Sequence, residues 1–106
     1  MNSQMQISDL ANIISEKIFI KIENWNLYLG DAGLARNLAL ECISNLDKGS
    51  QQAAKLSLEA IKVKIGDGNQ TILLSKLVTA SQICDLEEIL DNLSLLIIFL
   101  LVDLIY

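Results

Sequence analysis

Few side chains in this sequence are of the types that carry catalytic chemistry. The chain contains no histidine, so it lacks the commonest general base and metal ligand. Its two cysteines, Cys42 and Cys84, stand far apart in no CxxC arrangement, and neither has a histidine with which to form a nucleophilic pair. We expect both to be buried thiols, with a disulfide or redox pair as the alternative.

Two other groups resemble binding motifs at first sight. The segment 66–69 (Gly-Asp-Gly-Asn) begins like a phosphate or calcium loop, but no Walker lysine follows it, and Ile72 stands where a calcium loop needs glycine. A hairpin turn accounts for these residues. The carboxylates of Glu87, Glu88 and Asp91 share one helical turn, where a solvated helix face is the usual role and acid or metal-ligand chemistry the rarer one. The sequence therefore predicts no enzyme, no cofactor and no metal site.

The net charge of −5 is concentrated near one end of the chain. Residues 1–76 carry eight cations and eight anions, so every unit of net charge follows Lys76. An acidic, unbalanced segment repels phosphate backbones, which argues against nucleic-acid binding. Met1–Asp9 is polar and lacks the basic start of a signal peptide, so we expect a cytoplasmic protein.

Any site must be positioned by helices and strands, and the first sixty residues show the apolar spacing of helices. At 106 residues the chain is long enough for one domain. Ser8 and Asp9 can cap a first helix, which we extend through residue 29, although the alternating isoleucines of 18–22 also suit a strand. Asp31 can cap a second helix that ends at Lys48–Gly49, and a third is predicted over Gln51–Ala60. The apolar stripe of the second helix contains Leu34, Leu38, Cys42 and Leu46.

The last forty residues contain the clearest local signals. Residues 61–65 and 70–74 alternate between apolar and polar around a Gly-Asp-Gly-Asn segment, which predicts a β-hairpin. Ser81 can cap a final helix whose apolar residues recur at spacings of three and four, as in a heptad repeat. These residues are Ile83, Leu86, Leu90, Leu93, Ile97, Leu100 and Leu104. We therefore predict an α+β fold, a mainly helical single domain with one β-hairpin packed on helices.

The end of that helix is unusually apolar. We divide the chain into an α+β domain, residues 1–94, and an apolar extension of the last helix, residues 95–106. The extension is too short for a transmembrane helix, contains Asp103 and has no flanking Lys or Arg. A helix that is apolar all round needs neighbours on all sides, which a small domain hardly supplies. Burial in the monomer's own core is one interpretation; docking on a second copy or on another protein is the one we favour.

Five residues are the predicted contacts with such a partner: Trp25, Tyr28, Leu96, Phe99 and Leu100. On a helix Trp25 and Tyr28 lie three residues apart, and both residue types are common interface anchors. Packing in the core with polar tips near the surface is the alternative for this pair.

One segment carries a family resemblance. Residues 25–34 form the pattern W-x-LYL-x-DA-x-L, and shorter matches follow at 63–68, 74–77, 85–86 and 89–90. Over residues 8–92 the sequence resembles a small uncharacterised family of cyanobacterial proteins, a domain of unknown function. The resemblance implies a cytoplasmic or thylakoid-associated accessory protein with no known catalytic residues to carry over. Proteins of this type tend to end in a polar stretch soon after the position of Leu93, whereas this chain continues with apolar residues.

The functional hypothesis is a non-catalytic protein-binding module or accessory factor, acting in the photosynthetic or carbon-fixing machinery. A peripheral membrane protein that uses its apolar end is the first alternative. A small-molecule-binding domain with a pocket between hairpin and helices is the second.

Overall fold

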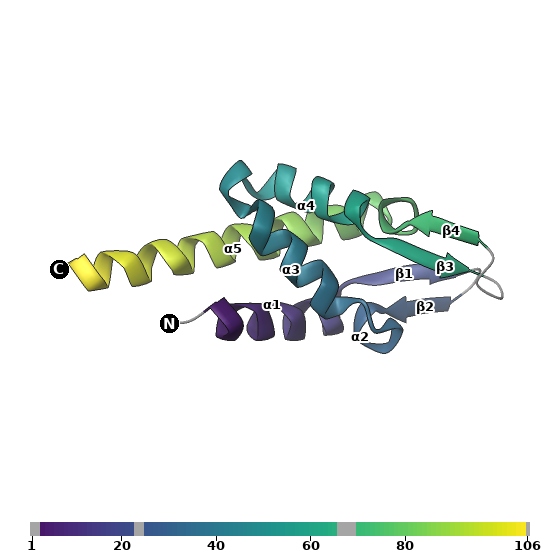
Figure 1. Cartoon of the computed structure of the whole chain (residues 1–106), viewed down its shortest axis with the longest axis horizontal. Coiled ribbons are helices and arrows are strands. Elements are labelled where there is room, and N and C mark those ends of the chain that lie inside the picture. The colour runs from purple at the N-terminus through teal and green to yellow at the C-terminus, as the bar shows by residue number, and fades with distance from the viewer. Residues whose placement is uncertain (1–2, 23–24, 66–69, 106) are drawn as a thin grey trace.

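The computed structural model describes residues 3–22, 25–65 and 70–105, with side chains for 7–21, 26–64 and 70–97. Five α-helices, two short 3₁₀ turns and four strands make up this part of the chain (Figure 1). In chain order they are α1 Ser3–Lys17, β1 Phe19–Ile22, β2 Trp25–Tyr28, α2 Leu29–Ala32, α3 Ala35–Asn45, η1 Leu46–Lys48, α4 Ser50–Ala60, β3 Lys62–Ile65, β4 Gln70–Leu73, η2 Leu74–Lys76 and α5 Ala80–Ile105. The predicted class, α+β and mainly helical, is confirmed.

The prediction of a long first helix through residue 29 was wrong. Helix α1 ends at Lys17, and β1 and β2 form an antiparallel hairpin in which Phe19 pairs with Tyr28. Ile18 and Ile20 are buried while Lys21 is exposed, which is the alternation of a strand with one buried face. The structure therefore contains two hairpins where one was predicted, and Tyr28 lies on a strand, not on a helix.

The second hairpin agrees with the prediction. Strands β3 and β4 pair antiparallel, with Val63 opposite Ile72, and the Leu74 N–H donates to the Ile61 carbonyl at 2.9 Å. Lys62 and Lys64 are exposed on the other face. The predicted turn, residues 66–69, lies outside the described residues.

The second predicted helix is interrupted at its start. The chain makes the single turn α2, in which Asp31 lies, and reverses at Gly33, whose φ of 74° is left-handed. Gly33 and Leu34 then donate N–H groups to the carbonyls of Gly30 and Leu29, as in a helix C-terminal cap. Helix α3 begins only at Ala35, so Asp31 does not cap it. Its stripe is nevertheless as predicted, with Leu38 and Cys42 fully buried.

Two other caps were predicted wrongly. Helix α1 begins at Ser3, five residues before Ser8. Helix α5 begins at Ala80, and the Oγ1 atom of Thr79, not of Ser81, accepts a hydrogen bond from the Gln82 N–H at 3.2 Å. A threonine oxygen satisfies one of the free N–H groups of the first helical turn. The predicted third helix is confirmed as α4, Ser50–Ala60.

The core lies where α1, α3, α4 and α5 pack in sequence, α1 against α3, α3 against α4 and α4 against α5. Each helix contributes at least one fully buried aliphatic side chain, and each such side chain stabilises the fold by about 1.5–3 kcal/mol. They include Leu10, Ile14, Leu38, Leu58, Leu86 and Leu90. Both hairpins lie at one end of the molecule, and the C-terminal end of α5 projects at the other (Figure 1). The resulting shape is elongated, with extents of 54 × 23 × 21 Å.

Candidate partner-binding surface

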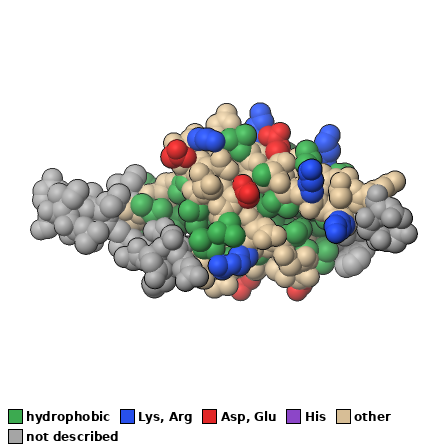
Figure 2. Space-filling view, in the orientation of Figure 1, with side chains coloured by type: hydrophobic (Ala, Val, Ile, Leu, Met, Phe, Trp, Pro, Cys, Tyr) green, Lys and Arg blue, Asp and Glu red, His purple; other side chains and the backbone are tan. Residues whose placement is uncertain are grey.

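The side chains of helix α5 are buried in its first half and become exposed further along the helix. Leu86 and Leu90 are fully buried, Leu93 is half-buried, and Leu95 and Leu96 are 55 % and 54 % exposed. Figure 2 shows hydrophobic side chains on the visible face beside the place where α5 leaves the body. The chain thus presents large aliphatic side chains to water on a helix that continues to Ile105, in the segment that the sequence indicated for docking.

Tyr28 and Leu96 are the two predicted contact residues whose side chains the structure describes, and they do not lie together. Tyr28 is on β2, at the hairpin end of the molecule, whereas Leu96 is on the projecting end of α5 (Figure 1). Tyr28 is 38 % exposed, and its ring lies 5.3 Å from that of Phe19 at an interplanar angle of 59°. The side chains of Trp25, Phe99 and Leu100 lie outside the described residues.

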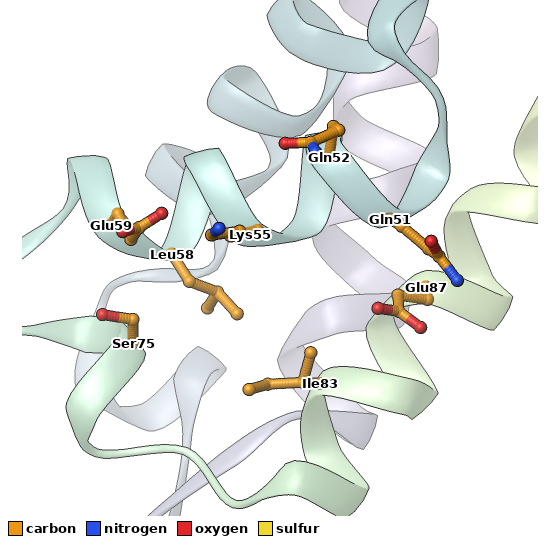
Figure 3. Close-up of a pocket in the computed structure, with 8 residues that line it drawn as sticks. All are labelled: Gln51, Gln52, Lys55, Leu58, Glu59, Ser75, Ile83 and Glu87. Atoms are coloured by element: carbon orange, nitrogen blue, oxygen red, sulfur yellow. The ribbon is translucent and has the colours of Figure 1, made fainter.

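Two hollows flank α5 on its buried half. The larger, about 600 Å³, is open and lies between α4 and α5. In Figure 3 the side chains of Leu58 and Ile83 point toward each other at its base, with Lys55 above and Gln51 beside Glu87 at one side. Basic, acidic and amide groups are mixed at its rim, so this hollow favours no single class of ligand.

The second hollow, about 440 Å³, lies between the first hairpin and α5. Glu16 and Lys17 at the end of α1 form one side, and the tilted ring pair of Phe19 and Tyr28 forms another. Its α5 side includes Asp85 and Glu88. We call it the hairpin cleft.

Gln82 connects α5 to the first hairpin and was missed in the sequence. Its side chain is only 5 % exposed. Its Oε1 atom accepts the Phe19 N–H at 2.7 Å, and its Nε2 atom donates to Asp85 Oδ2 at 3.1 Å. A buried amide with both ends bonded fixes the position of the hairpin on the helix. The only signal in the sequence was a polar residue one position before Ile83 of the apolar stripe.

Replacing Gln82 with methionine tests this role. The volume is nearly kept, but the Phe19 N–H loses its acceptor, so the free energy of unfolding should fall by about 1–3 kcal/mol. Amide hydrogen exchange at Phe19 should accelerate more than at core positions of α3. The matched control is Gln51→Met, which removes an exposed amide and should leave stability and exchange unchanged. Equal exchange at Phe19 in both variants would show that this hydrogen bond does not hold the hairpin.

The two cysteines differ, and the prediction of two buried thiols was wrong for Cys84. Both are free; Cys42 is buried and Cys84 is exposed on α5. Burial raises the pKa of the Cys42 thiol to about 11, while a hydrogen bond with Ser57 acts in the opposite direction. Cys42 is therefore a neutral core side chain at neutral pH, a poor nucleophile and metal ligand.

The described carboxylates form no obvious reaction centre. Glu88 and Asp91 are exposed and Glu87 is half-buried on α5, as expected for a solvated helix face. Within the described ranges, no three histidine, cysteine, aspartate or glutamate side chains lie close enough to hold a metal ion. The same ranges contain no helix with both the length and the apolar character needed to cross a membrane.

Comparison with known proteins places the chain in a family without giving it a function. Neither the curated proteins nor the solved structures contain a match to this chain. One family model does match, over residues 7–93, and its description is protein of unknown function (DUF3181). The match covers both hairpins and the buried half of α5, and it ends two residues before Leu95. The chain therefore belongs to the DUF3181 family, whose proteins are described as of unknown function.

Proposed function

We propose that this chain is a non-catalytic protein-binding module, and that the projecting end of α5, from Leu95 onward, is its docking element. The observation that carries the proposal is the exposure of Leu95 and Leu96, 55 % and 54 %, on a helix that runs on to Ile105. Adjacent exposed leucines on a projecting helix suit a helix-in-groove contact, in which aliphatic side chains enter an apolar surface of another polypeptide.

The chemistry of the chain supports binding over catalysis. It has no histidine, and the thiol of Cys42 is buried with a raised pKa. Two free thiols suit a reducing compartment, and we accordingly propose the cytoplasm. We extend the proposal to an accessory factor of the photosynthetic or carbon-fixing machinery on the strength of the sequence resemblance alone.

The first test changes only the exposed leucines. In the full chain, Leu95→Gln with Leu96→Gln keeps helix propensity but removes the apolar contact. We expect this variant to lose association with its partner, measured as self-association by sedimentation velocity and as specific capture from a lysate of the native cell. A loss of about tenfold or more in affinity corresponds to two buried leucines withdrawn from an interface.

The matched control removes two exposed aliphatic side chains elsewhere. Ile13 on α1 and Leu40 on α3 are each 42 % exposed, so Ile13→Gln with Leu40→Gln makes the same chemical change away from α5. The proposal requires this control to associate as the wild type does. If both double variants associate equally, the docking element is not on α5. If the wild type co-floats with lipid vesicles while it captures no protein, the peripheral membrane alternative replaces the proposal.

A further inference from the structure

A second surface has a chemistry of its own, and it lies wholly inside the family match. The hairpin cleft is lined by residues from position 16 to position 92, whereas the docking element begins at Leu95. The two surfaces share no residue, because the last lining residue of the cleft is Asn92. An inference about the cleft therefore goes beyond the proposed function.

The aromatic base of the cleft comes from the first hairpin. Phe19 and Tyr28 are opposite each other in the β1–β2 register, and their ring centroids lie 5.3 Å apart with the planes tilted by 59°. Phe19 is half-buried and Tyr28 is 38 % exposed, so part of the Tyr28 surface is open to a ligand. The hydrogen bond from the Phe19 N–H to buried Gln82 holds this pair against α5. The cleft thus has a fixed aromatic surface.

The charge of the cleft is negative. Glu16, Asp85 and Glu88 contribute three carboxylates, and Lys17 is the one cation among the lining residues. Carboxylates beside an aromatic ring repel phosphate and attract cations. A guanidinium group matches this lining best, because it stacks on an aromatic face with its plane and donates paired hydrogen bonds to carboxylates at its edge.

We propose that the hairpin cleft binds an arginine side chain presented by a partner protein. In this arrangement the guanidinium plane stacks on the Tyr28 ring, and its N–H groups donate to the carboxylates of Glu16 and Glu88, which line the same cleft. The volume of about 440 Å³ is within the usual range for ligand sites. A single arginine in such an open cleft gives weak binding, so the cleft would select the partner's orientation and add to contacts made elsewhere.

The test titrates the full chain with the blocked tripeptide acetyl-Ala-Arg-Ala-amide, followed by NMR of the Phe19 amide and the Gln82 side-chain amide. The matched ligand contains citrulline, which keeps the shape of arginine without its charge. We expect saturable shifts of these two groups with the arginine peptide, weakened by salt, and a Kd for the citrulline peptide at least about fivefold higher.

Substitutions of the lining carboxylates test whether the peptide binds in the hairpin cleft. Glu16→Gln and Glu88→Gln change exposed carboxylates, and each should raise the Kd about two- to fivefold. The matched control, Glu59→Gln, removes an exposed carboxylate of the other hollow and should leave the Kd unchanged. Leu95→Gln with Leu96→Gln should also bind the peptide normally, so failure here and failure of the docking proposal are distinct results. The proposal is overturned if citrulline binds equally, if Glu59→Gln weakens binding as much as Glu88→Gln, or if no saturable shift appears up to about 20 mM peptide.

Discussion

Replacing Leu90 with alanine should lower the free energy of unfolding by about 2–5 kcal/mol, the largest single loss we expect in this protein. Leu90 is fully buried, on the half of α5 that packs on α4 and α1. Removing its three outer carbons loses their transfer free energy and leaves a cavity that the surrounding helices fill only in part. Urea denaturation followed by circular dichroism measures the change.

The matched control is Leu95→Ala, the same substitution five residues further along the same helix. Leu95 is 55 % exposed, and alanine is the better helix former, so in dilute protein the stability should change by less than about 0.5 kcal/mol. Equal losses at the two positions would mean that the end of α5 is packed as tightly as its buried half, and that no docking surface is exposed there.

The second large effect is a pH dependence that originates at Cys42. Its pKa is about 11 in the folded protein against 9.0 for a free thiol. The unfolded chain therefore loses this proton first as the pH rises, and unfolding becomes more favourable between pH 9 and pH 11. The stabilisation is complete below pH 9, and a difference of two pKa units corresponds to about 3 kcal/mol.

The variant Cys42→Ala isolates this effect, because it removes this thiol and leaves every other side chain unchanged. The wild type should lose about 2 kcal/mol more than Cys42→Ala between pH 8 and pH 11, and Cys84→Ala should behave as the wild type does. A wild type and a Cys42→Ala variant with parallel stability curves would contradict the burial of this thiol.

Strong periodicity made most of the helices and one hairpin predictable. The stripe of α3, the span of α4 and the alternation in β3 and β4 all agree with the structure. In each case the apolar spacing fits only one period, and Gly49 ends the turn η1 that follows α3. Local residue types are then enough to predict the secondary structure, because burial of one face decides between helix and strand.

The first hairpin was missed because its residues fit both periods. Ile14, Ile18 and Ile22 are spaced as on a helix, while Ile18, Ile20 and Ile22 alternate as on a strand. No glycine marks the loop between β1 and β2, which removed the usual hairpin signal. The β-branched and aromatic content of residues 18–22 was the signal that favoured a strand. Hydrogen bonds between distant residues, including the one that the Phe19 N–H donates to Gln82 Oε1 over 63 positions, are not visible in local spacing.

The candidate surfaces were predictable to different degrees. The apolar excess after Leu93 pointed to the end of α5, where the structure places Leu95 and Leu96 in exposed positions; docking there stays a prediction. The hairpin cleft could not be found, because it depends on Phe19 and Tyr28 pairing across strands that were expected to be helical. A cleft assembled from residue 16 to residue 92 requires the tertiary fold.

The most direct test of the docking proposal asks what covers Leu96 in the native cell. Replacing Leu96 with the photoreactive residue benzoylphenylalanine, and Leu40 in a parallel chain, compares two exposed leucines, 54 % and 42 %. On illumination we predict one discrete cross-linked polypeptide at position 96 and none at position 40. No polypeptide at 96, or the same products at both positions, would contradict the proposal that this end of α5 binds a protein.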